Sequence, residues 1–497
     1  SNPASATLES DFFFRSQEDV EEFAARGSNL RIQGGVVVEN AVVSLAGLSG
    51  ITIIEGSLDI RRTATLTDLR GLDNLTSIGG ALRIKENERL RSLEGLSSLA
   101  GVTRNLEIRD NPALKTLSGL EGLRTAGEEL IIEANDSLSS MAALRGLEFV
   151  SSQIRVRLNG SLPSLDGLQG LSEIGGSINL ILNNSLVSLE GLDNVRQIRG
   201  DLDLFSNATL VSLAHLEALT TVGGSLTIAQ SRLTSLEGLE NLASVRELRI
   251  ADNEGLTSLR GLEALRHISD GLAIVADATL RDLTGMSSMQ SLDGGLVIDR
   301  NDALTSLDGL EFITSLGKAL TLFGNNQLDD LQGLRNLTAL GGLLEIRRNA
   351  TLRSLDGLEG LDSIRTDLGI TSNPALVSLE AMRGLRTVGG AVEVRDNGAL
   401  VSLAGLESIR SAEHLTIIGH PRLTRLAQMD QLTQIRGSLT ISLNAVLTSL
   451  AGLDQLATVQ GFVVVSDNES LASMEGLEGL VLVGRFVTIS GNGSLSS

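Results

Sequence analysis

The four histidines of this chain, His215, His267, His414 and His420, have the side chains best suited to acid–base or metal chemistry. Such a site needs carboxylates or further imidazoles at ligand spacing, and none of the four has an Asp or Glu cluster in that arrangement. The sequence holds no cysteine, so thiolate metal sites and a cysteine nucleophile are excluded. It also lacks a G-x-S-x-G motif and a phosphate-binding glycine loop. We therefore expect no enzyme activity and no cofactor.

Composition narrows the classes of partner. The 497 residues carry a net charge of −21, which disfavours contact with nucleic acid and with anionic membranes. There is no Trp and no Tyr, so stacking platforms for bases are improbable. No apolar run reaches the roughly 18 residues of a membrane span. The expected partner is a protein or cell-surface ligand, or further copies of this chain, with no nucleic acid and no membrane insertion.

One repeated unit accounts for almost the whole sequence. It reads L-x-S-L-x-G-L-x-x-L-x-x-I-x-G-x-L-x-I-x-x-N-x-x, as in the stretch that begins at Leu66 and restarts at Leu90. About 19 turns of 23–24 residues follow one another from Val42 onward. We divide the chain into an N-terminal cap, residues 1–41, with a short helix and a first strand, and a repeat solenoid, residues 42–497.

Two apolar periods coexist within each turn and predict an all-β fold. The segment L-x-I, for example Leu82 and Ile84, alternates as a strand with one buried face does. The remaining leucines recur every three residues, with a glycine in the middle, which argues against a helix in each turn. A single turn cannot bury its apolar side chains, but stacked turns can, each strand pairing in parallel with its copy one turn away. The pattern therefore predicts a parallel β-solenoid.

Glycine and asparagine recur at fixed positions of the turn. Glycine at the sixth position, as in Gly71 and Gly95, predicts a bend with positive φ. Asparagine at the twenty-second position can satisfy turn backbone groups and stack its amide on the next, forming a structural ladder. Its representative members are Asn87, Asn111, Asn135, Asn325, Asn349 and Asn492.

Acidic residues also form rows, at the fifth and eighth positions of the turn. Glu94 and Asp166 belong to the first row, Asp73 and Glu121 to the second. Copies in consecutive turns are expected about 4.8 Å apart, where like charges repel. We interpret the rows as a solvated face, with weak shared binding of Ca²⁺ or another cation as the alternative.

The outer face of the L-x-I sheet is the predicted binding surface. The residue after the second apolar position of L-x-I should point to solvent. In the turns in the middle of the solenoid this residue is apolar. Such a contiguous exposed stripe marks a contact site, although strand-forming residues on a sheet face are the simpler explanation. Its predicted partner-binding members are Ile181, Phe205, Ala229, Ala251, Val275 and Phe323.

The units L-T-S-L-E-G-L-E-N-L (233–242) and L-T-Q-I-R-G-S-L-T-I-S-L-N (432–444) resemble the receptor L-domain repeat. The stretch F-R-S-Q-E-D-V-E-E-F-A-A-R-G (14–27) is similar to the helix that opens such domains, with a capping-type start at Ser16 and Asp19. The resemblance implies a right-handed parallel β-solenoid with an N-terminal helical cap. A leucine-rich repeat of the internalin kind, which also has L-x-x-L-x-I-x-x-N, is the alternative. The absence of cysteine favours a bacterial surface or secreted member, and ligand sites cannot be transferred from receptors.

These observations lead to a functional hypothesis. We expect a non-enzymatic binding or adhesion rod, secreted or on the cell surface, that uses the outer face of the L-x-I sheet. The alternative is a structural protein that assembles end to end into a filament or sheath through an uncapped C-terminal end, because the repeat there continues in register without a polar cap.

Overall fold

The computed structural model describes residues 6–426 and 429–496. The chain divides into two compact units, Ser1–Arg246 (unit 1) and Glu247–Ser497 (unit 2), both built from the same repeat. Strand β20 (Ser244–Ala251) contains the boundary between them. The expected boundary after residue 41 stays a prediction.

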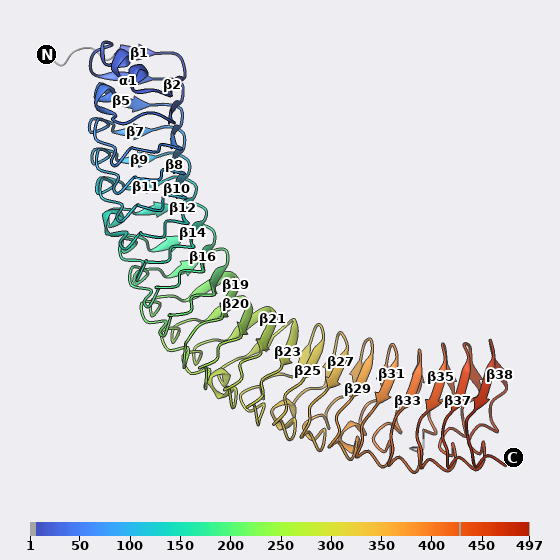
Figure 1. Cartoon of the computed structure of the whole chain (residues 1–497). Coiled ribbons are helices and arrows are strands. Elements are labelled where there is room, and N and C mark those ends of the chain that lie inside the picture. The colour runs from blue at the N-terminus through green and yellow to red at the C-terminus, as the bar shows by residue number, and fades with distance from the viewer. Residues whose placement is uncertain (1–5, 427–428, 497) are drawn as a thin grey trace. The chain divides into compact units, whose positions relative to one another are not determined.

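In unit 1 the L-x-I segments form a continuous parallel sheet, the main sheet, with each strand one turn from the next (Figure 1). Leu82 lies beside Leu106 and Ile84 beside Ile108, so the register is one whole repeat. The strands of this sheet are β2 (Phe12–Phe14), β4 (Val36–Glu39), β6 (Leu58–Arg61), β8 (Leu82–Lys85), β10 (Leu106–Arg109), β12 (Leu130–Glu133), β14 (Ile154–Arg157), β16 (Ile178–Ile181), β18 (Leu202–Phe205) and β19 (Thr221–Ala229).

A second, shorter strand precedes the main strand in the turns of unit 1. It also pairs in parallel with its copies, as Ser77 and Ile78 do with Gly101 and Val102. These strands are β1 (Ala6–Leu8), β3 (Leu30–Ile32), β5 (Ile51–Ile54), β7 (Ser77–Ile78), β9 (Gly101–Val102), β11 (Thr125–Ala126), β13 (Phe149–Val150), β15 (Glu173–Ile174) and β17 (Gln197–Ile198).

Unit 2 repeats this arrangement. Its main strands are β21 (His267–Val275), β23 (Gly295–Asp299), β25 (Leu320–Phe323), β27 (Leu344–Arg347), β29 (Leu368–Thr371), β31 (Val392–Arg395), β33 (Leu415–Ile418), β35 (Leu439–Ser442), β37 (Val463–Ser466) and β39 (Val487–Ser490). Its short strands are β22 (Ser291–Leu292), β24 (Ser315–Leu316), β26 (Ala339–Leu340), β28 (Ser363–Ile364), β30 (Thr387–Val388), β32 (Ser411–Ala412), β34 (Gln434–Ile435), β36 (Thr458–Val459) and β38 (Leu482–Val483).

Helix is rare in the described residues. The α-helix α1 (Gln17–Ala24) begins at a capping box, in which the Ser16 hydroxyl accepts from the Asp19 N–H and the Asp19 carboxylate accepts from the Ser16 N–H. The expected capped start is therefore confirmed. Single 3₁₀ turns replace the glycine bend in five repeats: η1 (Ala46–Leu48), η2 (Ala142–Leu144), η3 (Thr284–Met286), η4 (Gln332–Leu334) and η5 (Glu380–Met382). None of these described helices is long and apolar enough to cross a membrane.

The phenylalanines beside α1 divide between core and surface. Phe12 and Phe14 of β2 each form a T-shaped ring contact with Phe23 of α1, with centroids 5.2 Å apart in both pairs. Phe13, between them on the strand, points outward and is 52% exposed. Strand alternation explains the difference, because the side chain of Phe13 points away from those of Phe12 and Phe14.

The core is the stack of inward leucines and isoleucines. In the turn that starts at Leu90, Leu93, Leu96, Leu99 and Ile108 are fully buried as well. The predicted parallel β-solenoid is confirmed, with about 20 turns and very little helix. Leu482, Phe486 and Val487 are exposed in the last described turn, and end-to-end assembly stays a prediction.

Most glycines of the row adopt the positive φ that their recurrence predicted, whereas Gly285 and Gly333 lie in 3₁₀ turns without it. Gly71 has φ of 111° and Gly95 of 114°. Close packing adds a second requirement, because a Cβ on Gly95 would lie far inside contact distance of the Leu69 carbonyl oxygen, one turn earlier. Glycine is therefore needed both for the bend and for the approach of consecutive turns.

Candidate binding face

A row of buried side chains lies along one corner of the turns and fixes the ends of the main strands. In most turns the Asn donates from Nδ2 to a main-chain carbonyl of the preceding turn, and its Oδ1 accepts from the residue at the same position of that turn. Asn87 donates to the Ile60 carbonyl oxygen at 3.0 Å and to Asn111 Oδ1 at 3.0 Å. Asn87, Asn111, Asn135, Asn325 and Asn349 are fully buried, and Asn492 is half-buried. We call this row the ladder.

Four ladder positions hold a residue other than Asn: Thr63, Ser231, Asp277 and His420. Thr63 accommodates the change because its hydroxyl donates to Asn87 Oδ1 at 2.7 Å. His420 reproduces both functions of the amide, as Nδ1 accepts from the Asn397 N–H at 3.3 Å and Nε2 contacts the Val394 carbonyl oxygen at 3.1 Å. Burial lowers the pKa of His420, which favours the neutral ring that this pairing requires.

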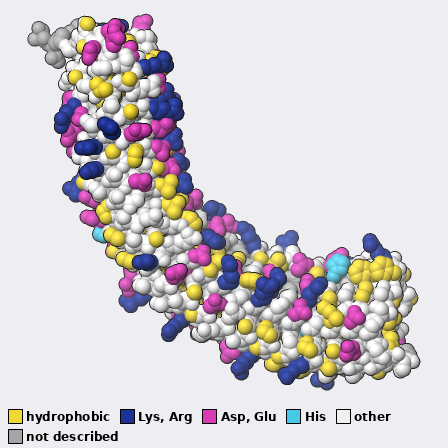
Figure 2. All heavy atoms as spheres, viewed as in Figure 1, with side chains coloured by type: hydrophobic (Ala, Val, Ile, Leu, Met, Phe, Trp, Pro, Cys, Tyr) yellow, Lys and Arg dark blue, Asp and Glu magenta, His cyan; other side chains and the backbone are white. Residues whose placement is uncertain are grey.

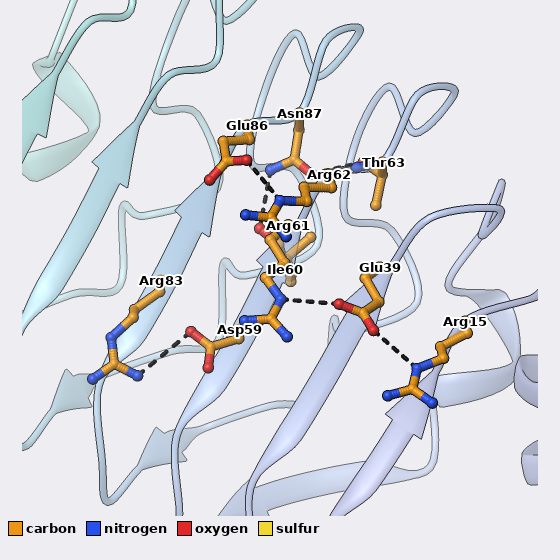
Figure 3. Close-up of polar contacts among 10 residues, drawn as sticks. All are labelled: Arg15, Glu39, Asp59, Ile60, Arg61, Arg62, Thr63, Arg83, Glu86 and Asn87. Atoms are coloured by element: carbon orange, nitrogen blue, oxygen red, sulfur yellow. Dashed lines mark hydrogen bonds and ion pairs between the residues drawn. The ribbon is translucent and has the colours of Figure 1, made fainter.

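The ladder holds one edge of the main sheet, and the outward residues of that sheet carry charge near the N-terminal end of unit 1. Figure 3 shows Glu39 between Arg15 and Arg61, with N–O distances of 2.9 and 3.0 Å. Asp59 contacts Arg83 at 3.5 Å. Hydrogen bonds from Arg15, and then from Arg61, lower the pKa of Glu39 although burial opposes them. These charges are therefore largely neutralised within the face.

Further along unit 1 the same face turns apolar. Phe205 at the end of β18 is 38% exposed, and Ile181, beside it in register on β16, is half-buried. Leu158 and Leu182 follow β14 and β16 directly and are 42% and 38% exposed. Main-chain hydrogen bonds join each leucine to the end of the next main strand. The Leu158 N–H donates to the Ile181 carbonyl, and the Leu182 N–H donates to the Phe205 carbonyl. We call Leu158, Ile181, Leu182 and Phe205 the apolar patch.

Leu158 and Leu182 are the members that sequence reasoning missed. Both have positive φ, 56° and 59°, at a position that is mostly polar, Ala or Gly in other turns. Leu443 of unit 2 is the one further leucine in this row among the described residues, and it is 57% exposed. A leucine has no local benefit in this conformation and loses apolar burial in solvent. Two leucines in consecutive turns of this row, next to the outward Ile181 and Phe205, were the signal that could have revealed the patch.

The predicted continuous stripe is wrong at three of its members. Ala229 is only 2% exposed, Ala251 1% and Val275 8%. Ala229 lies in register beside Phe205, and a short side chain next to a longer neighbour is shielded from solvent even when it points outward. The stripe therefore reduces in unit 1 to the neighbourhood of Ile181 and Phe205.

In unit 2 the outward Phe323 of β25 has a different environment. It is half-buried, and the guanidinium groups of Arg347 and Arg348 lie 5.8 and 5.7 Å from its ring centroid. Both distances are within the range of cation–π contacts. Phe323 is therefore partly covered by its own chain, whereas the apolar patch of unit 1 is open.

The histidines occupy separate places. His215 takes the glycine position with φ of 77°, and its Nδ1 lies 2.6 Å from Asp193 Oδ1. His267 contacts the Ser291 hydroxyl at 3.1 Å, and His414 accepts from the Ser438 N–H at 3.0 Å. Within residues 6–426 and 429–496, no three His, Cys, Asp or Glu side chains are grouped to hold a metal ion.

The acidic row at the eighth position has a structural role. Its carboxylates accept from the N–H of the bend residue two positions earlier, as Asp73 does from Gly71 at 2.8 Å and Glu359 from Gly357 at 2.9 Å. The bend amide would otherwise lack a partner within the turn. Each of these carboxylates thus accepts a hydrogen bond within its own turn, which leaves it less able to bind a cation shared with the next turn.

Replacing Glu359 by Ala should lower the free energy of unfolding by about 0.5–1 kcal/mol, because the Gly357 N–H then bonds only to water. Addition of calcium should leave the melting temperature of the unmodified protein unchanged. Calorimetry with and without millimolar calcium checks both expectations. A calcium-dependent rise that disappears in Glu359→Ala would instead favour the cation-binding alternative.

No family model and no curated protein matches this sequence. Among solved structures, an internalin (InlF) from Listeria monocytogenes is similar over 80% of this chain and 88% of its own, with 15% identity and a TM-score of 0.33. The structure of a TLR13–ssRNA13 complex is similar over 98% of this chain and 80% of its own, with 14% identity and a TM-score of 0.30. The repeat, the parallel strands paired one turn apart and the buried ladder make this chain a parallel β-solenoid of leucine-rich turns.

Proposed function

We propose that this chain is a non-enzymatic protein-binding scaffold, and that the apolar patch on the main sheet of unit 1 is its contact site. The observation that carries the proposal is the exposure of Leu158, Leu182 and Phe205 on three adjacent turns. A soluble solenoid has no need of large apolar side chains in these outward positions, and contiguous ones are typical of contact sites.

Two arginines border the patch and indicate the chemistry of the partner. Arg155 and Arg157 are half-exposed on β14, and Arg157 lies in register beside Ile181. Arg155 donates to the Gln153 side chain at 2.9 Å, and Arg157 Nε is buried without a hydrogen-bond partner. Neither forms an ion pair with the described residues, unlike Arg61 and Arg83 on the same face. A partner that offers an apolar side chain beside carboxylates would complement both features.

The surface of unit 1 carries charged side chains in one part and apolar side chains in another, as the residues of the main sheet do. Figure 2 shows Lys and Arg side chains gathered with Asp and Glu along the edge that carries the main sheet, and apolar side chains further along the same unit. A location outside the cell or on its surface, with a role in adhesion, is part of the proposal and is supported by the resemblance of the repeat to receptor L domains.

Replacing Phe205 by Glu should abolish capture of the partner while the fold persists. An outward carboxylate costs little in water, but its desolvation in an apolar interface costs several kcal/mol, which corresponds to a loss of affinity of roughly 100-fold or more. The measurement is capture from an extract of surface proteins, followed by calorimetric titration of the protein that is retained.

Phe149→Glu is the matched control, because Phe149 is 52% exposed in unit 1 but lies on β13 of the other sheet. A partner retained by the wild type and by Phe149→Glu, and lost by Phe205→Glu, supports the proposal. Equal retention by both variants would place the contact elsewhere. Loss of mass in sedimentation of pure Phe205→Glu relative to the wild type would identify the partner as a second copy of this chain.

A further inference from the structure

Asp277 departs from the other members of the ladder in its chemistry. It is fully buried in unit 2, and its Oδ1 accepts from the Asn253 N–H at 2.8 Å and from Asn253 Nδ2 at 3.1 Å. Its own N–H donates to Asn301 Oδ1 at 3.0 Å. Up to this point Asp277 behaves as an asparagine would.

The difference lies at the second carboxyl oxygen. Asp277 Oδ2 is buried without a hydrogen-bond partner. In the following turns the equivalent atom is an Nδ2 that donates to the carbonyl 27 residues earlier, from Asn301 to Ile274 at 3.0 Å and from Asn325 to Ile298 at 2.9 Å. The same register places the Ile250 carbonyl opposite Asp277 Oδ2. Two acceptor oxygens cannot bond to each other, but a proton on Oδ2 would supply the missing donor.

His420 shows what the ladder requires of a substitute. A neutral imidazole offers one acceptor and one donor, and the ring uses both, toward Asn397 and Val394. A neutral carboxyl group offers the same pair, whereas an ionised one has acceptors only. Of the ladder residues described, Asp277 and His420 are thus the two whose fit depends on protonation, and each fits only in its uncharged form.

The charged groups around Asp277 act in both directions. Burial raises its pKa most, the hydrogen bonds from Asn253 lower it, Asp252 raises it and Arg249 lowers it, and the result is about 7. On the following turn, Asp299 and Arg300 form an ion pair with each other at 3.2 Å. No neighbouring cation contacts Asp277 Oδ2, since that atom has no partner.

We propose that Asp277 carries a proton in the folded protein and donates it to the Ile250 carbonyl, so that the surrounding turns lose stability as the pH rises through neutrality. Because the pKa of Asp277 is raised above its ordinary value of 3.8, the folded chain holds a proton between these two values that the unfolded chain releases. The resulting stabilisation is complete below about pH 4 and is lost as the pH approaches and passes about 7.

The test compares the wild type with Asp277→Asn between pH 4 and pH 8. Hydrogen exchange of the amides around Asn253, corrected for the intrinsic pH dependence of exchange, reports the local stability. In the wild type, protection should fall about tenfold or more from pH 5 to pH 8. In Asp277→Asn, whose amide supplies the donor at every pH, it should not fall. Parallel profiles of the two proteins would overturn the proposal.

Two further variants separate this effect from others. Asp252→Asn removes the exposed neighbouring carboxylate, which raises the pKa of Asp277, so the fall in protection should persist but begin at a somewhat lower pH. Asn325→Asp places a carboxyl group in an ordinary ladder position and should create the same fall in protection around Asn301 and Ile298, independently of whether Asp277→Asn folds well. A flat profile in Asn325→Asp would also overturn the proposal.

Discussion

Replacing Asn325 by Leu should lower the local free energy of unfolding by about 3 kcal/mol. Leucine is close to asparagine in size, but it leaves the Ile298 carbonyl and the Asn301 N–H buried without their partners, which now lie at 2.9 and 3.1 Å. Since a solenoid unfolds in parts, the measurement is hydrogen exchange of the adjoining turns rather than a single melting temperature.

The adjacent Asn326 provides the matched control. It is exposed, and its Nδ2 donates to the Asp302 side chain at 2.8 Å instead of to the main chain. Asn326→Leu should therefore change exchange in the same turns little. If the two substitutions changed hydrogen exchange equally, the buried amide of the ladder would stabilise the turn no more than an exposed amide does.

Replacing Gly95 by Ala should destabilise the turn by about 3 kcal/mol or more, although only one methyl group is added. The residue has φ of 114°, which L-amino acids rarely adopt, and the new Cβ would overlap with the Leu69 carbonyl oxygen of the preceding turn. Because that oxygen belongs to the main chain, it cannot move without displacing the turn. Hydrogen exchange of the amides in this turn and its neighbours measures the loss.

Gly160→Ala serves as the reference substitution. Gly160 lies outside the bend, its φ is not positive, and the nearest atom to a new Cβ would be Asp136 Oδ1 at 3.7 Å. We expect it to be neutral or slightly stabilising, because alanine restricts the unfolded chain. Similar losses at Gly95 and Gly160 would contradict the role assigned to the bend.

The fold could be predicted because each of its physical requirements recurs in most turns. Buried leucines, a bend with positive φ and a buried amide each select a residue type at a fixed position of the turn. A residue type that is ambiguous in one turn becomes informative when it recurs in many. The parallel pairing of Leu82 with Leu106 follows from the same repetition, since strands one turn apart have the same alternation.

The candidate site was harder to predict because exposure is not a property of one position. Alternation gives the direction in which Ala229 and Val275 point, but the length of neighbouring side chains decides whether solvent reaches them. The binding role of Ile181, Phe205 and Phe323 stays a prediction, and only a partner can test it. Leu158 and Leu182 lie one residue beyond the L-x-I strand, where strand alternation no longer predicts the direction of a side chain.

The structural role of the acidic row at the eighth position could have been predicted from its spacing to the bend glycine. Glu359 follows Gly357 by two residues, and the same interval links Asp73 to Gly71. Charge alone suggested a solvated face or a cation site. The spacing of two residues between a bend glycine and a carboxylate predicts a local hydrogen bond, because a side chain at that distance can reach back to the bend N–H.

The pairing of every main strand with the copies one turn away has a mechanical consequence. If the chain is pulled from its ends, a load on one turn is carried only by its neighbours, so turns should detach one after another rather than together. Each released turn of about 24 residues would add roughly 80 Å of extended chain. A protein made in this way would lengthen in small, regular steps under tension and could regain each step separately when the tension falls.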